Sequence, residues 1–455
     1  MKKLICVFLM LAVGLTAVSC NRSESDGDEI PISNTPVEPI DNIPETDMKN
    51  NPENTAESSE ISEISEISGD SGDSGNSDIH IRKIHAILQT ADEIRAGTYP
   101  VKTAYENPAI LQVGPDKQYK TPAAAIAKAK SGDIVEIDAG DYYNAGAVAQ
   151  IGSAGNSLKD LTIRGVGGRA NMIADADTKL ASGGQGVWAV YANGAQIENI
   201  GFSGAAFDQS ASGVRINAMN IIFRNCYIAH NNMGALSYND NQYDGGYLIF
   251  IDCEFDGNGN GSGSSHNVYI GNGCEKFWLI DSYSTGVDNG YLIKTRAKNS
   301  YIINSSLICA PNSKSGVPLN VPIGGNLYVI GSVLQQNNKQ DSRLIRYDEE
   351  STASYYQPGL DYYLFNDTFI TYANGNDCLQ FSGSYRKGEY APVIYNCIFA
   401  VNGGNPGKFV KEENGNYIGN VDSVSFIDPK NYDFRLSDES DAAFVGKGFS
   451  GPVKK

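Results

Sequence analysis

The strongest constraint on the fold is a short strand-and-turn unit that recurs about every 23 to 35 residues. Each unit is a run of β-branched, aliphatic or aromatic residues that ends in Asn, Asp or Gly. A period of this length is typical of a solenoid, in which each repeat packs mainly on its neighbours. The ten units end at Asp138, Gly165, Asn199, Asn225, Asp252, Asp281, Asn304, Gly331, Asn366 and Asn396.

One coil of a parallel β-helix uses this many residues. Asn, Asp and Gly tolerate positive φ, so their recurrence indicates a turn that stacks from coil to coil. The Leu consensus of leucine-rich repeats is missing, and each unit has one strand signature rather than a propeller's four. We therefore predict an all-β fold, a right-handed parallel β-helix of about ten coils over 131–440, with a tail over 441–455. Small residues follow the turn and indicate a tight interior column: Cys226, Cys253, Ser282, Ser305, Ser332 and Cys397.

Two segments before the repeats predict helices in an N-terminal cap region, 81–130. Thr121 and Pro122 precede the alanine-rich stretch 123–130, as an N-cap and a first-turn proline would. This helix is expected to close the open end of the solenoid. The amphipathic segment 84–95 is either a second helix on the cap or part of a stalk. At the other end, 426–429 and 433–436 resemble the closing segment of right-handed β-helix carbohydrate-active proteins.

The first twenty residues predict export. Lys2 and Lys3 precede an apolar run, 4–18, that stops at Ser19 and Cys20, as in a signal peptide. The sequence 17–20 resembles the lipobox of bacterial lipoproteins, which implies that Cys20 is lipidated and anchors the chain to the outer membrane or cell surface. An ordinary secretory signal is the alternative.

The segment 21–80 predicts a disordered acidic tether. It has no aromatic residue, and its sixteen acidic residues face two basic ones. The tether thus carries −14 of the net charge of −18; the signal contributes +2, which leaves −6 for the body. The body is only mildly acidic, so nucleic acid is a disfavoured partner, and we expect a monomer. Six cysteines lie in the body, and we expect mostly free thiols because three share the interior column: Cys226, Cys253, Cys274, Cys309, Cys378 and Cys397.

The middle coils hold the densest polar side chains. If Ile293 points inward, the alternation of a strand turns Leu292, Lys294 and Arg296 outward. Tyr269 and Asn267 would then lie on the adjacent coil, about 4.8 Å away. A stripe of cations and aromatic rings suits an acidic polysaccharide, and further substrate-binding candidates are Arg215, Asn217, Tyr238, Tyr291, Asn320 and Arg346.

The stretch 260–340 resembles a bacterial right-handed β-helix family whose central motif reads Gly-His-x-x-Lys-Ser-Arg-Ala. Lys294 and Arg296 match that motif, whereas Tyr291 stands where histidine is common and Thr295 replaces serine. The stretch is more weakly similar to β-helix polysaccharide lyases, in which a Lys or Arg is the base and cations neutralise the uronate.

The lyase resemblance implies a role for each candidate. Lys294 would remove the C5 proton, Arg296 would neutralise the carboxylate, and Tyr269 or His266 would protonate the leaving oxygen. Arg296 would also lower the pKa of Lys294 and increase its neutral fraction. Calcium shares the neutralising role in such lyases, and the metal is left open because four nearby acids form no calcium loop: Asp240, Asp244, Asp288 and Glu275.

Other interpretations stay open. The two cations could be solvated residues of an outer sheet, and His266 could be a turn residue. A uronate C5-epimerase begins with the same proton abstraction as a lyase. A glycoside hydrolase needs grouped carboxylates, which the motif-bearing coils lack. A non-catalytic carbohydrate-binding module or adhesin would display the same groove without turnover.

Overall fold

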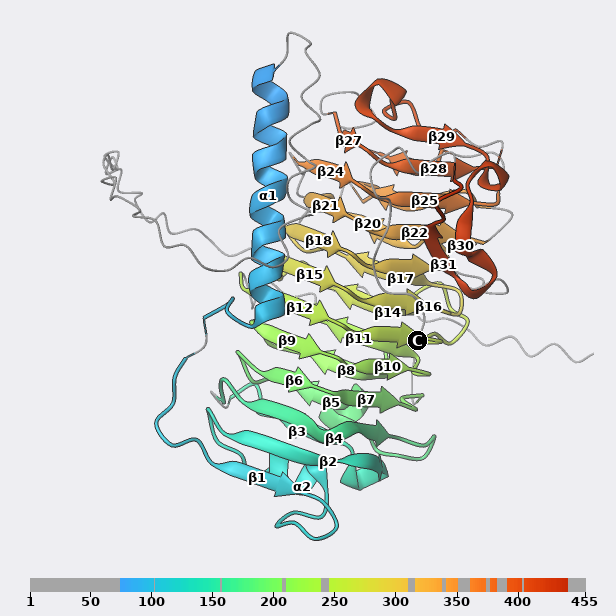
Figure 1. Ribbon diagram of the computed structural model, residues 1–455. Coiled ribbons are helices and arrows are strands. Elements are labelled where there is room, and N and C mark those ends of the chain that lie inside the picture. The colour runs from blue at the N-terminus through green and yellow to red at the C-terminus, as the bar shows by residue number, and fades with distance from the viewer. Residues whose placement is uncertain are drawn as a thin grey trace, which may run out of the picture. The chain divides into compact units, whose positions relative to one another are not determined.

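The chain forms a parallel β-helix, as the repeat predicts (Figure 1). It winds in the right-handed sense that parallel crossover connections take. The computed structural model describes residues 74–440 apart from 102, 156–157, 207–209, 239–244, 310–315, 338–340, 351–360, 374–376, 383–390 and 403–404. The signal, Cys20, the tether up to residue 73 and the tail 441–455 therefore lie outside the described residues.

Most coils contribute one strand to each of three stacked faces. The helix face consists of β1 (Ile110–Val113), β2 (Ile134–Tyr143), β4 (Thr162–Ile173), β6 (Gln196–Glu198), β9 (Ile221–Arg224), β12 (Tyr247–Ile251), β15 (Lys276–Ile280), β18 (Asn299–Ile303), β21 (Asn326–Ile330), β24 (Tyr362–Phe365) and β27 (Val393–Tyr395). The middle face continues from the second half of β4 through β7 (Ile200–Ser203), β10 (Tyr227–Ala229), β13 (Glu254–Asp256), β16 (Tyr283–Thr285), β19 (Ser306–Ile308), β22 (Val333–Gln336), β25 (Thr368–Thr371), β28 (Ile398–Val401) and β29 (Tyr417–Gly419).

The third, nine-stranded face carries the predicted site. Its strands are β3 (Ala149–Ile151), β5 (Gly186–Val190), β8 (Ser212–Ile216), β11 (Met233–Ser237), β14 (His266–Ile270), β17 (Tyr291–Thr295), β20 (Leu319–Val321), β23 (Ile345–Tyr347) and β26 (Leu379–Phe381). An antiparallel pair, β30 (Phe426–Asp428) and β31 (Asp433–Leu436), forms at the predicted closing segment. Short helical turns are α3 (Ala181–Gly184) and the 3-10 segments Asn144–Gly146, Glu412–Asn414, Val421–Ser423 and Pro429–Asn431.

The predicted corner is present in eight of the ten units. Positive φ occurs at Asn199, Asn225, Asp252, Asp281, Asn304, Gly331, Asn366 and Asn396. The first two units were predicted wrongly, because β2 and β4 run on through Asp138 and Gly165 with a register shift instead of a turn.

The small-residue column behind the corner is a hydrogen-bond ladder. The hydroxyl of Ser282 accepts from the backbone N–H of Cys253 at 3.1 Å, and Ser305 and Ser332 repeat this bond on the following coils. Asp367 extends the column as a buried carboxyl that accepts the N–H of Ser332 at 2.8 Å, and burial raises its pKa well above the usual range. The six cysteines of the body are buried and free.

The predicted cap helix is α2 (Pro122–Ile126), which is shorter than expected. The Thr121 hydroxyl accepts from Ala124 N–H at 3.4 Å, and Pro122 opens the helix. Pro122, Ala125 and Ile126 are buried, and α2 packs at the first coils. About one and a half helical turns of α2 thus cap the N-terminal end of the solenoid, and not the whole predicted stretch 123–130.

The longest helix, α1 (Ser74–Ala96), lies along the side of the solenoid and not on its cap or in a stalk (Figure 1). It also begins inside the segment predicted as tether. Ile84, Ile87, Ala91 and Ile94 are buried, and this spacing places them on one stripe. The stripe covers a column of stacked rings on the helix face: Trp278, Tyr301, Tyr328 and Tyr363.

Polar contacts hold α1 at two places. In its first half, Lys83 bonds Asp361 at 2.9 Å, and His80 bonds the Tyr363 hydroxyl at 2.7 Å. Near its end, Arg95 bonds Asp281 at 2.6 Å, and Arg224 donates to the carbonyl of Ile94 at 2.8 Å. An amphipathic stripe in the sequence indicates a buried side but not the surface that covers it. Within the described residues no helix is both long and apolar enough to cross a membrane.

We expect Ala91→Asp to detach α1 from the aromatic column. Ala91 is fully buried, and an aspartate there would have to place a larger, desolvated carboxylate in a space that holds only a methyl group. Trp278 is only 3% exposed, and Trp188, the other tryptophan of the chain, is fully buried in the core. Detachment would expose Trp278 to water, so the tryptophan emission of Ala91→Asp should shift to longer wavelength. The double variant with Ala91→Asp and Trp278→Phe should lack this shift. The exposed position Ala96→Asp is the control, and an unshifted spectrum of Ala91→Asp would contradict the packing.

Candidate functional site

The outward side chains of the nine-stranded face form a row that crosses successive coils. Backbone register pairs Arg215 with Leu236, Leu236 with Tyr269, and Tyr269 with Lys294. The row continues through Asn320 and Arg346 to Gln380. Neighbouring members are about 4.8 Å apart because that is the spacing of paired strands. The predicted neighbourhood of Lys294 and Tyr269 is therefore confirmed in its geometry.

Lys294 lies between two aromatic rings. Its Nζ is 5.4 Å from the ring centroid of Tyr269 and 5.8 Å from that of Tyr291. The nearest carboxylate oxygen, from Glu350, is 3.9 Å away, whereas arginines nearby sit 2.5–2.6 Å from their partners. Burial lowers the pKa of Lys294, and Glu350 and Glu349 oppose that shift. Lys294 is thus paired more loosely than its neighbours Arg296 and Arg346.

Arg296 forms a buried ion pair. It is 7% exposed and binds Glu350 through both Nε, at 3.2 Å, and Nη2, at 2.6 and 2.8 Å. Its guanidinium also lies 5.2 Å from the ring of Tyr269. A bidentate pair of this kind fixes both partners in orientation. The guanidinium therefore holds the ring of Tyr269 and the Glu350 carboxylate in place beside Lys294. Its own positive charge is already compensated by Glu350.

Arg346 organises the other side of Tyr291. Its Nη1 donates to the Tyr291 hydroxyl at 2.8 Å, and its Nη2 pairs with Glu349 at 2.5 Å. Glu349 also accepts from Asn320 Nδ2 at 2.7 Å. Burial raises the pKa of Tyr291, although Arg346 opposes it, so this hydroxyl remains protonated at neutral pH.

His266 lies beneath the two tyrosines. Its ring stacks on Tyr291 at 5.2 Å and meets Tyr269 edge-on at 5.5 Å. Nδ1 accepts the backbone N–H of Tyr291 at 3.0 Å, which requires an unprotonated Nδ1. Burial, followed by the charges of Lys294 and Arg296, lowers the pKa of His266 to about 3. The imidazole is therefore a neutral support for the rings.

The depressed pKa of His266 predicts a pH dependence that can be measured. The unfolded chain binds this proton as pH falls below about 6.5, whereas the folded chain does so only near pH 3. The stability from this group is therefore complete above the unfolded value and declines between the two. By NMR, the His266 ring protons should keep their shifts from pH 7 to pH 5 and titrate normally in urea. A folded-state midpoint near 6.5 would contradict the geometry.

Several predicted site residues lie elsewhere than expected. Asn267 was placed on the outer surface wrongly: it is fully buried and bonds Asn258 at 2.9 Å and Ser284 at 3.0 Å inside a corner. Its amide is used by that corner and cannot reach a sugar chain. Leu292 was also expected outside and packs in the core beside Ile293.

The remaining candidates occupy the edges of the site. Asn217 follows β8 and is 6% exposed, and Asn320 is fully buried beneath Glu349, so neither presents an open amide. Arg215 and Tyr238 lie together, with the guanidinium 5.6 Å from the ring, and Tyr238 is 38% exposed. This pair begins the row about three coils before Lys294.

Sequence reasoning missed the carboxylates that balance the row. Glu349 and Glu350 lie just after β23, and because they pair with Arg346 and Arg296 the row is not a simple cationic stripe. The run of three acids after Arg346-Tyr347 was the available signal. Among the described residues no group of three or more His, Cys, Asp or Glu side chains could hold a metal ion; Asp240 and Asp244 lie outside them.

No protein-family model and no curated protein matches the chain. Similar solved structures include pectate lyase Pel9A, at 14% identity and a TM-score of 0.47, covering 74% of this chain and 91% of that one. A rhamnogalacturonan lyase has 12% identity, a TM-score of 0.47 and coverage of 75% and 99%. Rice weevil pectin methyl esterase has 14% identity, a TM-score of 0.41 and coverage of 67% and 92%. At these TM-scores the likenesses say nothing about what this chain acts on.

Proposed function

We propose that the protein is a polysaccharide lyase that cleaves a uronate-containing chain by β-elimination, with Lys294 as the base. The observation that carries the proposal is Lys294 itself. It has a pKa lowered by burial, lies between two tyrosine rings, and holds its carboxylate partner only loosely at 3.9 Å. A base must be neutral to accept a proton, and a lowered pKa enlarges the neutral fraction.

The proposed reaction uses the groups around this lysine. Neutral Nζ of Lys294 takes the C5 proton of the uronate, and the C5–H electrons form the C4–C5 double bond. The bond from C4 to the glycosidic oxygen breaks, and the Tyr269 hydroxyl protonates that oxygen. Transfer of the proton from the Lys294 ammonium to the Tyr269 phenolate then restores both groups. The products are one chain end with a free hydroxyl and one with an unsaturated sugar.

Charge compensation at the uronate is assigned to Arg346. Arg346 and Lys294 flank the same Tyr291 ring, at 6.0 and 5.8 Å from its centroid. A guanidinium there can exchange part of its pairing with Glu349 for the substrate carboxylate and favour the enolate-like transition state. Arg296, held by Glu350, is a positioning residue in this mechanism, and His266 supports Tyr269 and Tyr291.

Arg215 and Tyr238 extend the binding surface. They lie on the same face about three coils from Lys294, which is about 14 Å at the strand spacing. An extended sugar chain that follows the row would reach them with a residue remote from the cleaved bond. Stacking on Tyr238 and a carboxylate contact with Arg215 would then add binding without taking part in chemistry.

The test incubates the protein with homopolymeric and alternating uronate polysaccharides and follows the ultraviolet absorbance of the unsaturated product. The matched control is the same polysaccharide with its carboxyl groups reduced, which should give no signal because its C5 proton is not acidic. Exchange of the C5 proton without cleavage would indicate an epimerase instead. Reducing ends without an absorbing product would indicate a hydrolase, and binding without either signal would indicate an adhesin.

A membrane-anchored location remains part of the proposal. The lipobox resemblance around Cys20 and the acidic tether would hold the body away from the membrane surface. Metabolic labelling with a fatty-acid probe, compared between the native chain and Cys20→Ala, tests this assignment directly.

A further inference from the structure

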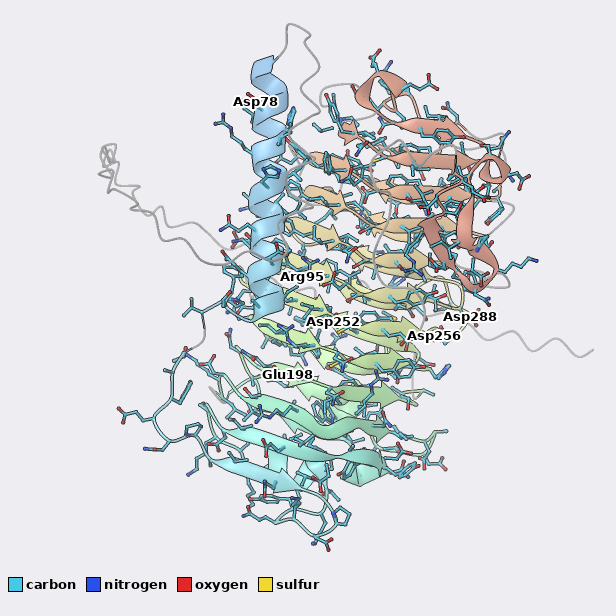
Figure 2. All side chains as sticks on the ribbon, viewed as in Figure 1. Asp78, Arg95, Glu198, Asp252, Asp256 and Asp288 are labelled. Carbon is cyan, nitrogen blue, oxygen red and sulfur yellow. The ribbon has the colours of Figure 1, made fainter. Side chains whose placement is uncertain are left out.

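A cavity lies on the helix face, beneath the segment that connects α1 to the first coil. It has a volume of about 750 Å³ and is separate from the row that contains Lys294. Its floor consists of residues of β2, β4 and β6, and Tyr247 forms one wall. The roof consists of Pro100, Val101, Thr103, Tyr105 and Pro108. Figure 2 places Glu198 on this part of the helix face, below the end of α1 where Arg95 is labelled.

The floor differs chemically from the rest of the helix face. Under α1, the outward side chains are apolar or aromatic, as at Ile249, Trp278 and Tyr301. In the first coils the corresponding positions are polar: Thr162 pairs in register with Gln196, and Arg164 with Glu198. Ile163 and Ile197 between them belong to the core, so the polar side chains point outward into the cavity.

Two floor side chains have no partner within the described residues. Gln196 is 8% exposed, lines the cavity and makes no side-chain hydrogen bond there. Glu198 likewise forms neither a hydrogen bond nor an ion pair in the described part of the chain. The Gln196 residue is mostly buried, but its amide atoms remain open to the cavity, where they are available to bond a polar occupant.

The roof is fastened to the floor at one end. The hydroxyl of Tyr105 donates to Asp160 at 2.8 Å, and its ring covers Gly132 so closely that a Cβ there would collide with it. Gly132 also has a φ of +81°, which favours glycine. The connecting segment is thus held over the sheet at Tyr105, whereas Val101, nearer α1, is 91% exposed.

The charges of the cavity are nearly balanced. Arg164 is paired with Glu136 at 2.6 Å, and Lys159 and Asp160 are adjacent in the sequence at the same rim. An anion or a cation would therefore meet no excess of opposite charge. Amide and carboxylate groups that can bond hydroxyls, together with the rings of Tyr105 and Tyr247, suit a neutral polyhydroxylated ligand.

We propose that this cavity is a binding site for a neutral mono- or disaccharide. The site uses the amide of Gln196 and the carboxylate of Glu198 as hydroxyl partners, with Tyr247 as a wall. It is independent of the lyase proposal, since it lies on another face and uses none of the same residues. The volume lies within the range of small-ligand sites.

The test is a saturation-transfer NMR titration of the protein with glucose, galactose, maltose and cellobiose. Binding of at least one sugar is expected, weakened roughly tenfold or more by Gln196→Leu because a buried hydrogen bond is lost. Glu198→Gln, which keeps the side-chain size, should weaken it similarly and stands in if Gln196→Leu does not fold. Gln150→Leu, at the exposed middle position of β3, and Lys294→Ala should leave the affinity unchanged.

Two results would overturn the proposal. One is that none of the four sugars gives a transfer signal with the native protein, which would mean that the cavity holds only water. The other is a titration in which the folded Gln196→Leu and Glu198→Gln variants bind as tightly as the native chain, since the sugar would then be bound elsewhere.

Discussion

The Lys294→Ala variant is expected to lose nearly all formation of unsaturated product, a fall of roughly 10²–10⁴-fold in kcat. Alanine cannot accept the C5 proton, and among the described residues no other lysine amine lies beside the two tyrosine rings. The side chain of Lys294 is 16% exposed and makes no short hydrogen bond in the described part of the chain, so the fold should persist. Circular dichroism and the rate of ultraviolet absorbance increase measure the two properties.

The matched control for this variant is Lys276→Ala. Lys276 lies on β15 in the helix face, away from the row, and its loss should leave the rate unchanged. In the native protein the rate should rise with pH as Lys294 loses its proton, with a midpoint below the ordinary 10.5 because burial lowers its pKa. An active Lys294→Ala variant that keeps the native pH profile would refute the assignment of the base.

The second large effect is expected from Glu350→Gln. Arg296 is buried, and removal of its counter-charge should lower the free energy of unfolding by about 2–3 kcal/mol. The value lies at the low end for buried pairs because the Glu350 side chain is 33% exposed and solvent screens the pair. Urea unfolding followed by fluorescence provides the measurement.

The same substitution should shift the pH profile of the reaction. Glu350 raises the pKa of Lys294, so its neutralisation lowers that pKa and moves the rising limb of the rate to lower pH. A purely structural role for Glu350 would change stability without this shift. Asp92→Asn is the control, because Asp92 is 67% exposed beside Arg95 and its pair should contribute under about 1 kcal/mol. Equal losses of stability in the two variants would contradict the buried pair.

The sequence by itself determined the coil, most of its corners and the closeness of Tyr269 to Lys294. These features depend on local φ preferences and on a repeat that stacks at a fixed spacing, so they can be read along the chain. The alternation predicted Asn267 and Leu292 on the outer surface wrongly. Both are buried together with the residue that follows them, because strict alternation of inward and outward side chains ends where a strand meets a corner.

Only the tertiary structure decided what compensates the cations and what covers the outer faces. Arg296 meets Glu350 across 54 residues, and α1 meets Asp361 and Tyr363 across more than 270. Such contacts depend on the lengths and paths of the connections between coils, which local residue propensities do not predict. The same holds for the cavity over Gln196 and Glu198, since its roof belongs to a segment distant from its floor.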